Sequence, residues 1–378
     1  MEINCHGGIY LIKKILDLVV VCGAYRSDWH ESTQDFAGIS INRKAPLDLI
    51  QNEALQELPD TKTKLSTKVI LDQYMGALSS ALSNIVKQID DVDANVPKHE
   101  TKISAIASDL KRVLNTFRFG TAITNPGNIL IIGKPNVGKS TLVNKLLGKD
   151  RVIVHHQPGT TRDPVSELIS IKDIPLNLID TAGIRETNHS IEQKSIEITK
   201  ELILKADKLI LMFDSSAPLE KDDIHLLDFL FSGLKSSDID SVKKYNTEES
   251  FATYNRKTEL IPVLNKTDLP TMINVKEIDH LLQPVQKHLN ITDIVKISAA
   301  NDVGISSLED RIVLEVNDYI NYKPKAPVIF KDRQFELLVE GCKKLDKMKH
   351  INDNNDKVED YSNLLKETKN ILYNCLDG

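Results

Sequence analysis

The sequence is poor in cysteine and in aromatic residues. Its 378 residues include 4 cysteines and 1 tryptophan, and 5% of them are aromatic. The cysteines stand far apart, without the spacing of a metal site, at Cys5, Cys22, Cys342 and Cys375. This pattern argues against a cysteine-based metal centre and suits a reducing compartment.

A strong charge of one sign and a long apolar run are also missing. The formal charge is −6 and the isoelectric point is about 6.0, so a contact with nucleic acid must be local or shared with a partner. The strongest apolar run, residues 9–21, is interrupted by two lysines and an aspartate. It cannot span a bilayer, and we expect no membrane partner.

Residues 133–140 match the phosphate-binding loop pattern G-x-x-x-x-G-K-[ST]. An apolar strand over residues 128–132 precedes the loop, and a helix to about residue 148 follows it. Glycines in such a loop let backbone N–H groups point at phosphates, and the helix N-terminus attracts the same charge. We predict that Lys139 bridges the β- and γ-phosphates and that Ser140 holds Mg²⁺. The predicted nucleotide contacts here are Asn136, Val137, Gly138, Lys139, Ser140 and Thr141.

Asp180 and Gly183 predict the second part of a phosphate site. Asp180 ends the apolar run 176–179, where a carboxylate that supports Mg²⁺ belongs. Gly183 can offer its backbone N–H to the γ-phosphate because it has no side chain to block the approach. Residues 158–163 precede this motif, and we expect there a switch segment in which Thr161 binds Mg²⁺.

Two further segments predict that the bound base is guanine. Residues 265–268, Asn-Lys-Thr-Asp, follow an apolar strand over 260–264. The carboxylate of Asp268 can accept both guanine N–H groups while Asn265 holds the other side of the base, and adenine lacks that donor pair. Lys266 belongs to the same motif, and Ser298 with Ala299 supplies the last base contact. The sequence therefore predicts a protein that binds and hydrolyses GTP.

The residue after Gly183 narrows the class of GTPase. Many signalling GTPases carry a glutamine there that orients the attacking water, whereas Ile184 can neither donate nor accept a hydrogen bond. Residues 159–163 (Gly-Thr-Thr-Arg-Asp) and 180–185 (Asp-Thr-Ala-Gly-Ile-Arg), with Asn136, resemble the TrmE–Era–EngA group of GTPases. The continuation from 184 to 197 is similar to the MnmE family of tRNA-modification GTPases, also called TrmE.

The resemblance extends outside this domain. Residues 1–8 are similar to the MnmE family's V-E-I-H-C-H-G-G segment, and residues 47–54 to its L-D-L-x-Q-A-E-A segment. It implies an α/β P-loop GTPase domain with a mostly parallel sheet, inserted into an α-helical domain and preceded by a partial α+β N-terminal domain. We expect the N-terminal domain at 1–46, the helical domain at 47–120 and 323–378, and the GTPase domain at 121–322.

The MnmE resemblance also implies a mechanism and partners. Asn136 would ligate K⁺ beside the phosphates, Glu192 would orient the water, and Lys139, Thr161 and Gly183 would complete the catalytic set. K⁺ would stimulate hydrolysis through dimerisation of two GTPase domains. The family modifies the wobble uridine of tRNA together with a flavoprotein resembling MnmG. Residues 155–158, His-His-Gln-Pro, depart from the small residues usual in the K⁺ loop.

Three expectations concern the extent of the chain, its location and its class. We expect most of the family's folate-binding N-terminal domain to be absent. We also expect the family's terminal C-[IVL]-G-K tail to be absent, because residues 365–378 match an internal helix of the family. The polar insertion 236–258 and the asparagine-rich segment 352–355 suggest a eukaryotic protein. For a eukaryotic protein the MnmE resemblance implies a mitochondrial location, with a bacterial cytoplasm as the alternative. A ribosome-assembly GTPase of the Era or EngA type, or a non-catalytic nucleotide-binding fragment, stays open.

Overall fold

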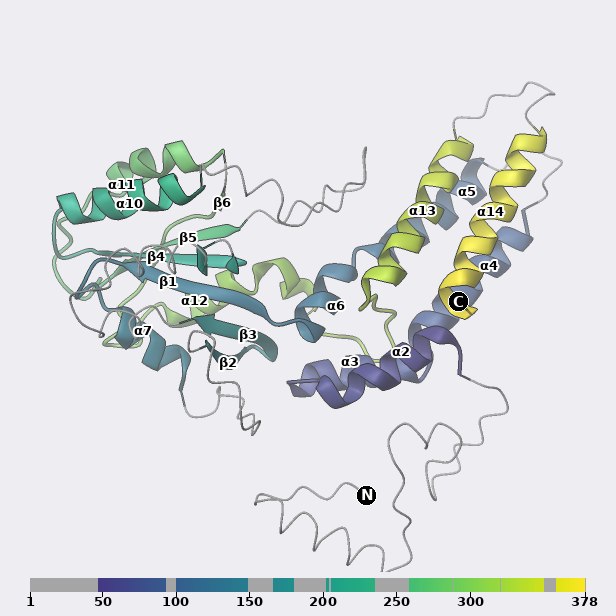
Figure 1. Ribbon diagram of the computed structural model, residues 1–378, viewed down its shortest axis with the longest axis horizontal. Helices are drawn as coiled ribbons and strands as arrows, with labels where there is room; N and C mark the ends of the chain where they lie inside the picture. The colour runs from purple at the N-terminus through teal and green to yellow at the C-terminus, as the bar shows by residue number, and fades with distance from the viewer. Residues whose placement is uncertain are drawn as a thin grey trace, which may run out of the picture. The chain divides into compact units, whose positions relative to one another are not determined.

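The computed structural model describes residues 47–92, 100–148, 166–179, 202–203, 205–234, 258–287, 289–319, 321–349 and 358–377. The chain divides into two units, Met1–Leu47 and Asp48–Gly378, and every described helix and strand belongs to the second (Figure 1). The elements expected in residues 1–46 and most of the insertion 236–258 lie outside the described residues. None of the helices that the structure describes has the length and apolar surface that a bilayer crossing requires.

A mostly parallel sheet forms the centre of the GTPase domain. Its order is β2-β3-β1-β4-β5-β6, with β7 also paired to β5, and within the described pairs only β2 and β3 run antiparallel. Because β1 lies between β3 and β4, the loops after these parallel strands gather at one edge. The strands are β1 (Gly127–Gly133), β2 (Ser166–Ile171), β3 (Ile174–Ile179), β4 (Lys208–Asp214), β5 (Glu259–Asn265), β6 (Asn290–Ile291) and β7 (Val295–Lys296).

Helices cover both faces of this sheet (Figure 1). They are α7 (Lys139–Leu146), α10 (Lys221–Leu234), α11 (Val275–Leu282) and α12 (Ile305–Ile312), with 3-10 turns η3 (Gln283–Val285) and η4 (Leu314–Tyr319). Alternation along β1 places Ile129 and Ile131 in one buried cluster with α7 and α12, and Leu130 and Ile132 in another with α10 and α11. Burial on both faces is why β1 is apolar at every position from 129 to 132.

Segments on both sides of the GTPase domain form one all-helical core. Helix α13 packs against α14 and α5, and α14 packs against α4 (Figure 1). Cys342 and Cys375 are fully buried in this core, and burial raises the pKa of each thiol to about 12, so both stay protonated at neutral pH. The helices are α2 (Leu49–Glu57), η1 (Leu58–Asp60), α3 (Lys64–Tyr74), α4 (Ala77–Asp90), α5 (Glu100–Leu114), α6 (Phe117–Thr124), α13 (Asp332–Lys349) and α14 (Val358–Asp377).

Two neighbouring residues of α3 hold the segment through which the chain leaves the GTPase domain. Gln73 is fully buried; its Nε2 donates to the carbonyl oxygen of Ala326 at 3.2 Å, and its Oε1 accepts from the N–H of Val328 at 3.1 Å. The carboxylate of Asp72 accepts from the Tyr322 hydroxyl at 3.0 Å. Buried backbone groups need such partners, so Gln73 fixes the path of residues 326–328.

The predicted fold class is confirmed for the described residues. A P-loop GTPase domain with a mostly parallel sheet separates two helical segments that share a core. The expected boundary between residues 120 and 121 lies inside α6, which therefore runs from one part into the other.

Candidate nucleotide-binding site

The phosphate loop lies between the end of β1 and the start of α7, as the motif predicts. Two residues take left-handed backbone angles, Asn136 with φ 62° and Gly138 with φ 103°. The Nζ of Lys139 donates to the carbonyl oxygens of Gly133, at 3.0 Å, and Lys134, at 2.8 Å. The ammonium group of Lys139 therefore lies across the phosphate loop, where it is predicted to contact the phosphates.

Gly138 is required by space as well as by its backbone angle. A Cβ atom added there would lie 2.3 Å from Nδ2 of Asn265. That amide nitrogen donates to the carbonyl oxygen of Val137 at 2.8 Å, and Oδ1 of Asn265 accepts from the N–H of Ala299 at 2.9 Å. Asn265 is only 3% exposed. One buried side chain thus joins the phosphate loop, the Asn-Lys-Thr-Asp segment and the Ser-Ala segment, which are far apart in sequence.

The rest of the Asn-Lys-Thr-Asp segment is held by its neighbours. Lys266 has a φ of 63°, and its Nζ donates to the carboxylate of Asp214 at 2.6 Å. Burial alone would raise the pKa of Asp214, but hydrogen bonds from Lys266 and Ser216 outweigh it and hold this pKa below its usual range. The N–H and hydroxyl of Thr267 both donate to the carbonyl oxygen of Ile297, at 3.1 and 3.0 Å. This anchoring leaves Asp268 exposed at the end of β5.

Ser298 and Ala299 follow β7 and are buried. The backbone of Ser298 pairs in both directions with Val303, and its hydroxyl accepts from the N–H of Asn301 at 3.3 Å. These bonds hold the two residues beside Asn265. The structure thus brings together Asn136 to Thr141, Asn265 to Asp268, and Ser298 with Ala299, while their contacts with a nucleotide stay predictions.

The cation sites are described only in part. Ser140 is exposed at the start of α7 and Asn136 is exposed in the phosphate loop. A hydroxyl and a carboxamide oxygen are donors suited to Mg²⁺ and K⁺ respectively, so both residues fit the expected ions. The other predicted site residues, Thr161, Asp180, Gly183 and Glu192, lie outside the described residues.

An ion pair lies behind the phosphate loop that was not predicted from the sequence. The Nζ of Lys134 lies 3.0 Å from a carboxylate oxygen of Glu220 and 3.1 Å from one of Asp223. Asp223 is 3% exposed and belongs to α10, which begins 7 residues after β4 ends. An acidic residue in the first turn of a helix is common, so the sequence had no signal for this contact.

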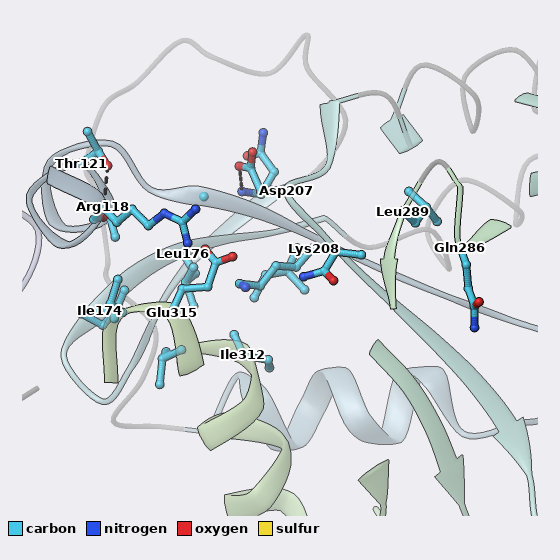
Figure 2. Close-up of a pocket in the computed structure, with 17 residues that line it drawn as sticks. Arg118, Thr121, Ile174, Leu176, Asp207, Lys208, Gln286, Leu289, Ile312 and Glu315 are labelled. Atoms are coloured by element: carbon cyan, nitrogen blue, oxygen red, sulfur yellow. Dashed lines mark hydrogen bonds between the residues drawn. The ribbon is translucent and has the colours of Figure 1, made fainter. Parts of the chain in front are cut away.

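A cavity of about 380 Å³ lies at the opposite edge of the sheet, where β1, β3 and β4 begin (Figure 2). Two of its polar side chains are engaged with the protein. Asp207 accepts from the N–H of Asn128 at 2.8 Å, and Lys208 pairs with the buried carboxylate of Glu259. The phosphate loop and base motif follow the other ends of the strands, so this cavity is separate from the nucleotide site.

A GTPase family model and several curated relatives match the sequence. A family model described as "50S ribosome-binding GTPase" matches residues 128–266. A tRNA modification GTPase MnmE from Alkaliphilus oremlandii is 32% identical over 328 residues, covering 82% of this chain and 63% of the relative. The MnmE of Thermotoga petrophila is 32% identical over 353 residues, covering 89% of this chain and 70% of the relative.

Solved structures match the domain at low similarity. The G domain of the Thermotoga maritima FeoB iron transporter is 24% identical, with a TM-score of 0.32, and covers 51% of this chain and 100% of its own. The sequence relatives span both the GTPase domain and the helical region. The chain belongs to the MnmE family of tRNA-modification GTPases.

Proposed function

We propose that this chain hydrolyses GTP as part of the modification of the wobble uridine of tRNA. The observation that carries the nucleotide-binding part of the proposal is Asn265, whose buried amide joins its own segment to the phosphate loop and to the Ser-Ala segment. Such a junction holds the predicted base-binding and phosphate-binding segments next to each other. The MnmE relatives support the tRNA part. The chain spans 63% of the length of its Alkaliphilus relative, so the activity of the whole relative comes to it only as a proposal.

In this proposal the phosphate loop positions the nucleotide for attack by water. The water oxygen bonds to the γ-phosphorus, the bond to the β,γ-bridging oxygen breaks, and GDP and inorganic phosphate leave. Lys139 and the loop N–H groups stabilise the charge that develops on the phosphate oxygens. Ser140, with Thr161 and Asp180, would hold Mg²⁺, which supplies charge neutralisation. Since Ile184 cannot orient the water, we assign that role to Glu192.

K⁺ and a second copy of the chain complete the proposed machinery. Asn136 would hold K⁺ near the β- and γ-phosphates, where other GTPases insert an arginine. Its φ of 62° and exposed side chain fit a residue at the rim of the loop. The resemblance to MnmE supports dimerisation through the GTPase domains.

The proposal of further partners is supported only by the resemblance to the MnmE family. These partners are a flavoprotein similar to MnmG and a tRNA, and the net charge of −6 favours a local tRNA contact. The polar insertion and asparagine-rich segment suggest a eukaryotic protein, for which the MnmE resemblance implies a mitochondrial matrix location; the relatives named above are bacterial.

The K⁺ mechanism predicts about 100-fold faster GTP hydrolysis in K⁺ than in Na⁺ at equal ionic strength, the size expected for one preorganised charge. Asn136→Ala and Glu192→Ala are each expected to remove most of that difference. Phosphate release at saturating GTP measures it. Asn321→Ala, at an exposed asparagine outside the predicted site, is the matched control and should keep the K⁺ response. Equal wild-type rates in the two salts would contradict the K⁺ assignment.

A further inference from the structure

Lys134 occupies the phosphate loop but its side chain points toward α10. The lysine side chain is 11% exposed, and the carboxylate of Asp223 that it meets is 4% exposed. Glu220, the other partner, is 58% exposed. Because Lys134 and Asp223 are both shielded from water, removing either member would leave a buried charge without its partner, whereas the exposed Glu220 can be solvated instead. The pair with Asp223 is therefore the anchor, and Glu220 adds to it.

Asp223 is itself fixed at the start of α10. One of its carboxylate oxygens accepts from the N–H of Glu220 at 3.0 Å, and its own N–H donates to the Glu220 carbonyl oxygen at 3.1 Å. The same carboxylate oxygen meets Lys134. The carboxylate of Asp223 that accepts from Lys134 is thus held in place by the first turn of α10, which it also caps.

The backbone of Lys134 contacts the lysine that is predicted to bind the phosphates. Its carbonyl oxygen accepts from the Nζ of Lys139 at 2.8 Å. Burial alone would lower the pKa of Lys134, but hydrogen bonds with Glu220 and Asp223 outweigh it and raise this pKa above its usual value. Lys134 therefore stays charged at neutral pH, and its two ends connect α10 to Lys139.

We propose that Lys134 is a positioning residue for GTP hydrolysis, which acts through its ion pair with Asp223 to hold the phosphate loop and Lys139 in place. The inference rests on the proposed GTPase function. It assigns Lys134 no contact with the nucleotide, because its ammonium group is turned to α10. Loss of the pair would let the loop backbone shift, and a misplacement of about 1 Å costs about 100-fold in rate.

Single-turnover GTP hydrolysis and nucleotide affinity test this role in the full chain. Lys134→Met and Asp223→Asn are each expected to slow hydrolysis by about 100-fold, and the double variant by no more than either alone. Lys134→Arg keeps the charge and should restore most of the rate. Lys344→Met is the matched control, since Lys344 pairs with Glu367 at 2.6 Å in the helical region, and it should leave the rate unchanged. Thermal unfolding identifies the variants that remain folded.

The possible outcomes separate this inference from the proposed function. Equal rates for the wild type and Lys134→Met would overturn the positioning role alone. A loss in Lys134→Met without one in Asp223→Asn would also overturn it, because the effect would then not pass through the pair with Asp223. A wild-type chain that binds no GTP would overturn the proposed function and this role with it.

Discussion

Replacing Asp268 by asparagine is expected to change the preferred nucleotide from GTP to XTP. The carboxylate can accept both N–H groups of guanine, whereas an amide has one acceptor and one donor. Xanthine carries a carbonyl oxygen where guanine has its amino group, so the amide donor then finds a partner. A charged hydrogen bond is worth about 1.5–3 kcal/mol, and we expect GTP affinity to fall by about 100-fold.

The change should leave stability almost untouched. Asp268 is exposed, and exposed substitutions of this kind alter the free energy of unfolding by about 0.5 kcal/mol or less. Titration with GTP, XTP and ATP measures the preference, and thermal unfolding measures stability. Asp279→Asn makes the same exchange at an exposed position of α11 and serves as the control. An Asp268→Asn protein that still prefers GTP over XTP would refute the assignment of Asp268 to the base.

Replacing Gly120 by alanine is expected to destabilise the junction of α6 with the helical core by about 3 kcal/mol or more. A Cβ atom at Gly120 would lie 1.8 Å from the carbonyl oxygen and 2.8 Å from the carbonyl carbon of Ile329. That backbone cannot move freely, because the N–H of Ile329 donates to the Thr116 hydroxyl at 3.0 Å and Ile329 is fully buried. Alanine favours a helix by about 1 kcal/mol, which is too little to offset the overlap.

Gly341→Ala provides a matched comparison in another helix. The nearest atoms to a Cβ atom at Gly341 lie 3.7 to 3.9 Å away, which is ordinary contact. The same substitution should therefore be neutral or slightly stabilising there. Denaturant midpoints of both variants, with wild type, measure the difference. An equal effect of the two substitutions would contradict the close packing of α6 on the segment around Ile329.

Local patterns were enough to predict the elements that carry the nucleotide motifs. The phosphate loop lies between β1 and α7, and both could be predicted, because the sequence shows an apolar run before Gly133 and a helical pattern after Lys139. Likewise, β5 ends at Asn265, where the base motif begins. These features depend on short-range spacing, which a single sequence records.

Contacts between distant residues could not be predicted. Lys134 meets a carboxylate 89 residues away, and Gln73 meets the backbone of Ala326 253 residues away. Nothing near a lysine or a glutamine in the sequence shows which buried partner it will have. The bond from Asn265 to Val137 was missed for the same reason, although the motif itself was found.

We propose above all that the phosphate loop, the Asn-Lys-Thr-Asp segment and the Ser-Ala segment together form a site that hydrolyses guanine nucleotides. Phosphate release from GTP and from ATP, each with Mg²⁺ and K⁺, tests it most directly when wild type and Lys139→Ala are compared. We predict hydrolysis of GTP by the wild-type chain, little or none of ATP, and loss of the GTP activity in Lys139→Ala. Equal hydrolysis of ATP and GTP, or full activity in Lys139→Ala, would contradict the account.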